Sequence, residues 1–288
     1  FDDYWNDHWS IPIDLLSQLE PAMSDLESLR EIRDTSVHIH REETAQARER
    51  KWRQLIGSAA IGHGELITDL PPDRGLGKGL YAPTTLANEL IDLFDGAQEE
   101  ILIVSAYLIP TPALEGAVER AVARGVRVRI LTNSIRSNNH LTAHSAYRNH
   151  VNQLLRDGAD LHEVRVDARD RAFYMITPID HKALALHAKA MTIDRDKVFV
   201  GSANLDPRSL RINSEMALLV ESEELNAALR EALMRDFSPA NAWHLQLDED
   251  DGVVWVSDWK TLTTQPAANF MQRIEDWFFA FLPLEDEL

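Results

Sequence analysis

Hydrophobic and polar positions alternate in blocks through the middle of the chain. From residue 82 onward, segments with apolar residues at helical spacing are followed by short runs that are mainly apolar. These blocks predict helices over residues 85–94, 112–123, 140–156 and 223–237, and strands over residues 101–107, 126–133, 161–166 and 216–220. Strands and helices that alternate in this way pack as a sheet covered by helices. The pattern therefore predicts an α/β fold with a mixed sheet.

The pattern changes toward both ends of the chain. Residues 1–60 are predicted to be mostly helical, and their Glu and Arg residues of alternating sign are typical of a solvated linker helix. A partner-binding helix is the alternative. Residues 61–240 hold the α/β domain, and residues 241–288 form a tail with an edge strand near 253–256 and an aromatic helix over 270–282. This last helix packs on protein or lies in a membrane interface.

The most specific pattern lies in a predicted hairpin. It reads H-x-K-x4-D-x6-G-S-x-N over residues 187–204. The first strand is predicted over residues 186–194, and side chains alternate between the faces of a strand. His187 and Lys189 therefore point the same way, and Asp194 begins a polar turn.

The second strand of the hairpin is predicted to begin at residue 198. It would return the chain so that Ser202 and Asn204 lie near His187 and Lys189. An imidazole can act as a nucleophile or a general acid, and an ammonium group with neutral donors can stabilise charge on a phosphate. The hairpin therefore indicates attack on a phosphodiester.

This pattern resembles the HKD motif of the phospholipase D superfamily. Within the superfamily, the chain resembles the bacterial cardiolipin synthases of the C type. Segments outside the hairpin carry the same resemblance: residues 107–110, 132–134, 205–209, 213–215 and 282–285, with His144 and Tyr147. The resemblance implies a phospholipase D-like mixed sheet flanked by helices, as one of two pseudo-repeated halves.

The resemblance also implies the chemistry. It points to a phosphatidyltransferase that acts on phosphatidylglycerol through a phosphohistidine, with His187 as the general acid and no cofactor or metal. The phospholipid substrate would be phosphatidylglycerol or phosphatidylethanolamine, and the acceptor would be another phosphatidylglycerol or a lipid alcohol. The residues implied as catalytic are His187, Lys189 and Asp194, and those implied as substrate-binding are Ser202, Asn204, Glu215, His144 and Tyr107.

Members of this family carry two HKD motifs, and this chain has one. The chain does not begin with Met, and residues 1–6 resemble the segment that follows the first motif. We therefore expect a C-terminal half, with the N-terminal HKD half as its partner. Two alternatives remain open: a phospholipase D-type hydrolase or nuclease completed by homodimerisation, and a non-catalytic half that binds lipid or a partner.

The composition of the chain limits its possible partners and its location in the cell. The net charge of −18 argues against nucleic acid as a partner and against simple adhesion to anionic lipid. With no cysteine, the chain has neither disulfides nor thiolate zinc sites. No apolar run reaches the roughly 18 residues that a membrane-spanning helix needs. These features and the resemblance predict a peripheral protein at the cytoplasmic face of the bacterial inner membrane.

Overall fold

The computed structural model describes residue 10 and residues 45–70, 83–175 and 181–282. The chain forms two compact units, Phe1–Ala60 and Ile61–Leu288. In the first unit, the described part holds the helix α4 (Ala45–Gly57), on which Glu49 and Arg53 form an exposed ion pair of 2.7 Å. Most of the helical linker that we predict over residues 1–60 lies outside the described residues.

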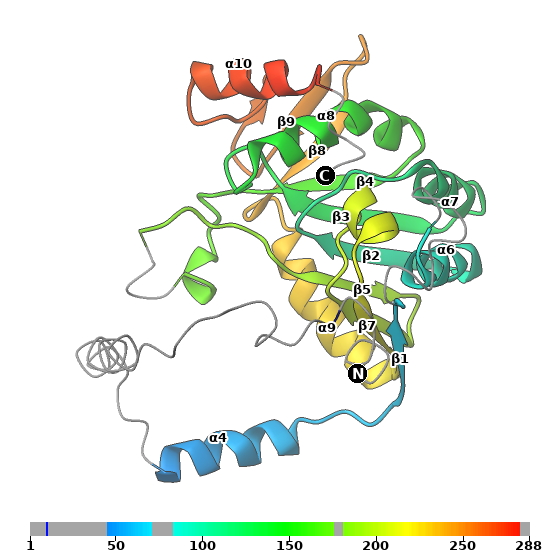
Figure 1. Cartoon of the computed structure of the whole chain (residues 1–288). Coiled ribbons are helices and arrows are strands. Elements are labelled where there is room, and N and C mark those ends of the chain that lie inside the picture. The colour runs from blue at the N-terminus through cyan, green and yellow to red at the C-terminus, as the bar shows by residue number, and fades with distance from the viewer. Residues whose placement is uncertain (1–9, 11–44, 71–82, 176–180, 283–288) are drawn as a thin grey trace, which may run out of the picture. The chain divides into compact units, whose positions relative to one another are not determined.

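The second unit is built on a ten-stranded sheet with the order β1-β7-β6-β5-β2-β3-β4-β8-β9-β10 (Figure 1). The strands are β1 (His63–Thr68), β2 (Glu100–Ser105), β3 (Arg127–Asn133), β4 (Asp160–Val164), β5 (Lys189–Ile193), β6 (Lys197–Gly201), β7 (Met216–Glu221), β8 (Ala242–Leu247), β9 (Val253–Val256) and β10 (Thr261–Leu262). The pairs β2–β3 and β3–β4 are parallel, and the other neighbours are antiparallel. The predicted mixed α/β sheet is confirmed.

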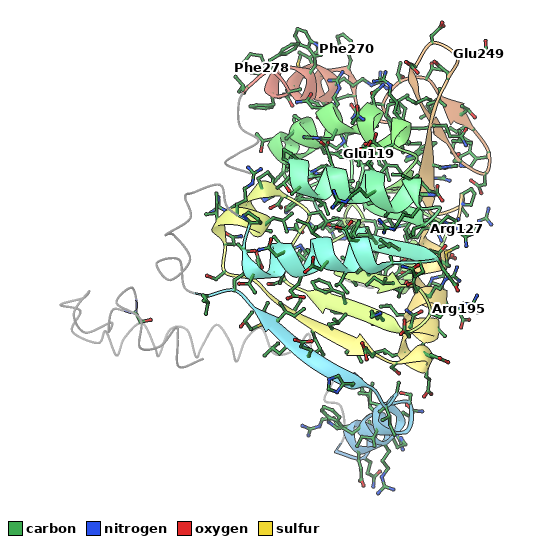
Figure 2. All side chains as sticks on the ribbon, turned by 90° about the vertical axis from the view of Figure 1, so that its right-hand side faces the viewer. Glu119, Arg127, Arg195, Glu249, Phe270 and Phe278 are labelled. Carbon is green, nitrogen blue, oxygen red and sulfur yellow. The ribbon has the colours of Figure 1, made fainter. Side chains whose placement is uncertain are left out.

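Helices cover both faces of this sheet. The helices α6 (Thr85–Gly96), α7 (Pro112–Ala123) and α8 (Leu141–Arg156) lie on one face, and α9 (Glu223–Asp236) lies on the other (Figures 1 and 2). Two separate apolar clusters correspond to these two faces. Thr84, Thr111 and Ser222 cap the starts of α6, α7 and α9 by accepting a hydrogen bond from a backbone N–H group in the first turn. The last helix, α10 (Phe270–Phe279), packs against α8.

The strand ends set where functional side chains can meet. β2 is buried at every position, as expected for a central strand with helices on both sides. Its last residue, Ser105, pairs with Lys189, the first residue of the antiparallel β5. The parallel β3 ends beside β2 at Asn133. We call this side of the sheet, marked by Ser105, Asn133 and Lys189, the His187 edge.

The structure differs from the predicted elements in several places. The strand predicted from residue 186 begins at Lys189. The backbone N–H and C=O groups of Leu186 form hydrogen bonds with the Asn133 side chain instead of with a neighbouring strand. β1 and β8 were not predicted, and β10 lies outside β9, so β9 is not the edge strand. β8 pairs with β4, which continues the sheet past residue 240. Among the described residues, no helix combines the length and apolar character needed to cross a bilayer.

Candidate active site at the His187 edge

His187 and Lys189 lie together at the start of β5, as the sequence predicts. The Lys189 Nζ atom is 3.1 Å from His187 Nδ1 and 2.9 Å from the His187 carbonyl oxygen. An ammonium group is only a donor, so Nδ1 must accept, and the proton of the neutral imidazole is on Nε2. His187 is exposed, and its Nε2–H group is therefore a hydrogen-bond donor at the surface of this edge.

Asn133 holds the backbone just before His187. Its side-chain nitrogen donates to the carbonyl oxygens of Ala106 and Leu186, both at 2.9 Å, and its oxygen accepts from the Leu186 N–H group at 2.9 Å. The buried amide of Asn133 thus gives Leu186 the two hydrogen bonds that a neighbouring strand would otherwise supply. Residues 132–134 are among the segments that resemble the family, but we predicted no role for Asn133. Its position at the end of a predicted strand was the one feature that could have indicated this role.

Ser202 and Glu215 form a second polar group beside Lys189. The Ser202 hydroxyl donates to the Glu215 carboxylate, whose other oxygen accepts from the Asn213 amide at 3.0 Å. The close pairing of β6 with β7 permits this contact, because a Cβ atom on Gly201 would lie 2.7 Å from the Met216 carbonyl oxygen. The structure thus joins two of the predicted substrate-binding residues, Ser202 and Glu215, by a contact that was not predicted.

The electrostatics tie this group to Lys189. Burial lowers the pKa of Lys189, and the negative charges of Glu215 and Asp206 oppose that shift. Burial in turn raises the pKa of the Asp206 carboxyl, which accepts a hydrogen bond from the Ser209 N–H group at 2.7 Å. A phosphate bound at this edge would lie near the Lys189 ammonium and near the carboxyl groups of Glu215 and Asp206. The positive charge of Lys189 is needed to offset the repulsion between the phosphate and these carboxyl groups.

Asn204 and Tyr107 lie on adjoining backbone at the same edge. Asn204 is partly buried, and its side-chain oxygen has no hydrogen-bond partner. The next residue, Leu205, donates its N–H to the Tyr107 carbonyl oxygen at 3.2 Å. The Tyr107 hydroxyl donates to Asn139 at 2.8 Å, and burial raises its pKa.

Asp194 does not lie with His187 and Lys189. It occupies the opposite end of β5, about 16 Å along the strand at roughly 3.3 Å per residue. Its carboxylate accepts hydrogen bonds from the backbone N–H groups of Gln98, Glu99 and Glu100, at 2.7 to 3.2 Å. The predicted catalytic Asp194 is placed where it ties the β5–β6 turn to the start of β2.

His144 is also placed elsewhere. It is fully buried between α8 and α10, where its Nδ1 atom is 2.7 Å from the Asp276 carboxylate. Its Nε2 atom is 3.3 Å from the Gln265 side-chain nitrogen, and the Tyr147 ring packs against it edge-on. We predicted a substrate contact for His144, and the structure gives it a packing role under α10.

An apolar cavity of about 420 Å³ opens beside His187. Val104, Leu131 and Val164 of the central strands form its floor, and Leu184 to Ala188 and α9 form its walls. His187 and Ala188 thus lie at the boundary between the polar His187 edge and this apolar cavity. The walls of this cavity come from segments far apart in the chain, so no local sequence pattern predicts it.

Comparisons with known proteins show which family the chain is similar to. The family profile described as cardiolipin synthase, PLD-like domain, matches residues 90–237. Cardiolipin synthase C of Escherichia coli (strain K12) is 33% identical over 225 residues, which cover 76% of this chain and 47% of that protein. An uncharacterized protein of Helicobacter pylori (strain ATCC 700392 / 26695) is 26% identical over 287 residues, 96% of this chain and 55% of that protein.

A solved structure is also similar. The phospholipase D family member Nuc from Salmonella typhimurium has a TM-score of 0.44 and 19% identity, and the match covers 62% of this chain and 97% of that one. The chain spans about half the length of the two curated relatives. The family profile covers slightly more than half of the present chain, including the whole HKD hairpin. The chain therefore belongs to the cardiolipin synthase, phospholipase D-like family.

Proposed function

We propose that this chain supplies one half of the active site of a phosphatidyltransferase of the cardiolipin synthase type, with His187 as the general acid. The observation that carries the proposal is the pairing of His187 and Lys189 at the exposed start of β5, where Lys189 Nζ lies 3.1 Å from His187 Nδ1. To donate a proton first, His187 must be the imidazolium, with a proton on both ring nitrogens, and the Lys189 ammonium then turns from Nδ1 toward the phosphate. The second histidine comes from the HKD motif of a partner half.

In the first step, the partner histidine attacks the phosphorus of phosphatidylglycerol. The bond from phosphorus to the leaving glycerol oxygen breaks, and the Nε2–H group of the His187 imidazolium protonates that oxygen, which leaves a neutral imidazole. In the second step, His187 Nε2 takes the proton of an acceptor hydroxyl. The acceptor oxygen then displaces the phosphohistidine, which restores both histidines. Lys189 holds a phosphate oxygen throughout, and the Ser202 hydroxyl and Asn204 amide bind the others.

The cavity beside His187 supports a lipid substrate. Most of its lining is apolar, and it reaches the residue that would protonate the leaving group. An acyl-glycerol segment would bury apolar surface there, which contributes roughly 25 cal/mol per Å². A nucleic-acid substrate would instead need basic side chains, which a chain of net charge −18 offers poorly.

An apolar patch supports a partner half. Leu66, Leu218 and Val200 form a cross-strand row on β1, β7 and β6, and Met216 extends it toward Ser202. Their exposed fractions are 64%, 45%, 48% and 54%. Exposed apolar side chains that adjoin one another usually mark an interface. The patch borders the His187 edge, where a second HKD motif would have to dock.

Helix α10 supports a peripheral location on the membrane. It buries Asp276 against α8 and exposes Phe270, Met271, Trp277 and Phe278. Figure 2 shows Phe270 and Phe278 pointing outward from α10. Its first turn lies near the His187 edge, since Gln272 donates to the Ile135 carbonyl oxygen at 3.0 Å. Aromatic side chains favour the membrane interface, so the active site would face the lipid.

The location has a direct test. Replacing Trp277 and Phe278 together by Ser should weaken binding of the chain to phosphatidylglycerol vesicles several-fold in a sedimentation assay. The matched control is Trp52→Ser, an exposed tryptophan on α4. Equal vesicle binding by the parent and the double variant would reject a role for α10.

The activity is tested by phosphatidyl transfer from labelled phosphatidylglycerol. The parent chain and His187→Ala should each be assayed alone and as part of a longer polypeptide that includes a second HKD motif. We expect the longer parent to form cardiolipin and the longer His187→Ala variant to lose at least about 10²-fold in rate, the minimum expected of a general acid. Phosphatidic acid as the sole product would indicate a hydrolase. Full activity of the His187→Ala variant would indicate a non-catalytic half.

A further inference from the structure

A second cluster of titratable side chains lies far from the His187 edge. Asp160, His162 and His244 place one carboxylate oxygen and two ring nitrogens within 4.8 Å of one another. Asp160 is the first residue of β4, which runs parallel to β3, so the cluster is at the opposite side of the sheet from Asn133. It takes no part in the proposed transfer reaction.

The strand pairing explains why these side chains converge. Asp160 and His162 are two residues apart on β4, so they point to the same face of the sheet. His162 is directly opposite His244 in the antiparallel β4–β8 pair, which places both rings on that face. The rings stack with centroids 4.7 Å apart and an angle of 9° between them. Both rings therefore present the same edge to Asp160.

The donor atoms point to one position. His162 Nε2 is 2.9 Å and His244 Nε2 is 3.0 Å from the same oxygen, Asp160 Oδ1. Tetrahedral zinc, with ligands about 2.0–2.2 Å away, separates neighbouring ligand atoms by about 3.3 Å. The two separations from Asp160 Oδ1 are a few tenths of an ångström shorter, and all three donor atoms lie within 4.8 Å of one another, so small movements of the side chains would admit an ion.

The surroundings suit a bound cation. The other oxygen of Asp160 accepts from Arg129 Nε at 2.8 Å, which fixes the carboxylate and leaves Oδ1 for the ligand position. The Phe237 ring packs edge-on against His162, whose side chain is only 9% exposed. His244 is 35% exposed, so an ion can enter from solvent. The amide nitrogen of Gln246 lies 3.1 Å from His244 Nδ1, and a half-turn of this amide would place its oxygen there to accept the ring proton of a metal-bound histidine.

We propose that Asp160, His162 and His244 bind a divalent cation of the zinc class. Two imidazole nitrogens and one carboxylate oxygen favour zinc or cobalt over magnesium or calcium, which prefer oxygen ligands alone. Three protein ligands leave a coordination position for water. The ion would link β4 to β8, and so fasten the strands β8, β9 and β10 to the parallel part of the sheet.

The first experiment measures metal binding by the full chain after treatment with a chelator. Titration with Zn²⁺ should show one ion bound per chain, and Co²⁺ should give visible absorption bands of a tetrahedral nitrogen- and oxygen-coordinated site. Asp160→Asn and His244→Gln should each weaken Zn²⁺ binding by at least about 10-fold, as expected when a group that orients or forms the site is lost. No step depends on turnover, so the result is independent of the proposed function.

The matched control is His150→Gln. His150 Nδ1 lies 2.7 Å from the Glu115 carboxylate, but the described residues provide no third ligand atom there. This variant should bind Zn²⁺ as the parent does. Zn²⁺ should also raise the melting temperature of the parent and the control, and leave that of His244→Gln unchanged.

Two results would overturn the proposal. One is the absence of stoichiometric Zn²⁺ binding by the parent chain. The other is binding by Asp160→Asn and His244→Gln with the parent's affinity, which would place the ion on other residues. Circular dichroism of each variant in the near ultraviolet verifies that its fold is retained, so a loss of binding can be assigned to the missing ligand.

Discussion

At the scale of single residues, the backbone before His187 depends on one buried amide. Asn133 makes three hydrogen bonds that connect the ends of β2 and β3 to Leu186. Without this side chain, the Leu186 N–H and C=O groups would need other partners. Asn133 is therefore a positioning residue. It fixes the backbone from which the His187 side chain projects, although it does not reach the reacting atoms.

Asn133→Ala should lower the free energy of unfolding by about 1–3 kcal/mol, the cost of leaving buried polar groups unpaired. It should also speed hydrogen exchange at the Leu186 amide, which is measured by NMR or mass spectrometry. Ser137→Ala is the control, because Ser137 is buried nearby and bonds within the 134–137 turn. Unchanged exchange at Leu186 in the Asn133 variant would contradict the positioning role.

A second residue-scale prediction concerns Glu163, which is fully buried on β4. It accepts hydrogen bonds from Tyr147 and Trp255 at 3.1 and 3.0 Å, and burial raises its pKa from 4.5 to about 7. The folded protein therefore keeps this proton while the unfolded chain loses it. Stability should fall as pH rises from about 4.5 to about 7, by up to a few kcal/mol at about 1.4 kcal/mol per pKa unit.

Glu163→Gln should remove most of this decline, because the amide does not titrate. Urea unfolding between pH 4.5 and pH 8 measures the effect. Glu65→Gln on β1 is the control, since Glu65 is exposed. The same fall in stability in the Glu163 variant and the parent would assign the pH dependence to other groups.

At the scale of elements, the two ends of strand β5 in the HKD hairpin have different roles: one carries the reactive side chains and the other anchors the hairpin. Lys189 begins β5 at the reacting end, and Asp194 follows its last residue in a left-handed conformation with φ of 51°. The Asp194 carboxylate binds the N–H groups that precede β2, and its own N–H donates to the Glu100 carbonyl oxygen at 2.8 Å. The hairpin is thus anchored at the end remote from the chemistry.

Asp194→Ala should cost on the order of 2 kcal/mol of stability, since hydrogen bonds to a charged group contribute about 1.5–3 kcal/mol. The rate of phosphatidyl transfer by the folded fraction should stay within about two-fold of the parent. Asp196→Ala in the same turn is the control, because the Asp196 contact with Ser222 uses its backbone oxygen. A loss of rate as large as that of His187→Ala would restore Asp194 to the catalytic group.

At the scale of the whole molecule, the second unit exposes a row of apolar side chains next to its reactive edge. Leu66, Leu218 and Val200 lie side by side across β1, β7 and β6. The helix α9 covers the neighbouring part of β5 and β6, where Val198 is buried. The sheet therefore keeps apolar surface exposed close to Ser202.

Leu218→Thr should weaken association of the chain with a separately expressed N-terminal HKD half by about 10-fold or more, as measured by sedimentation velocity. The stability of the chain itself should change by no more than about 0.5 kcal/mol, as is usual at exposed sites. Met271→Ser, an exposed apolar position on α10, is the control in this membrane-free assay. Equal association by all three proteins would exclude the patch as the docking surface.

The sequence predicted what depends on local periodicity. β2 and the pairing of His187 with Lys189 follow from apolar runs and from the alternation of side chains along a strand. β1 has few apolar residues and forms because β7 is available to pair with it. The partner of His144 is Asp276, 132 residues later, and no spacing rule connects them. Likewise, the sequence placed Asp194 in the turn after the strand, but it gave no sign that the Asp194 carboxylate would bind the backbone at the start of β2.

The anchored hairpin has a consequence for how such sequences can change. The interval between Lys189 and Asp194 is the length of β5, fixed at both ends by hydrogen bonds to β2. Inserting one residue would turn the ammonium to the opposite face of the sheet or detach the turn from its anchor. Substitutions inside this interval are therefore far easier to accommodate than insertions or deletions. In distant homologues, an unchanged number of residues between the positions of Lys189 and Asp194 would therefore indicate a working half-site better than the identity of the residue at the position of Asp194.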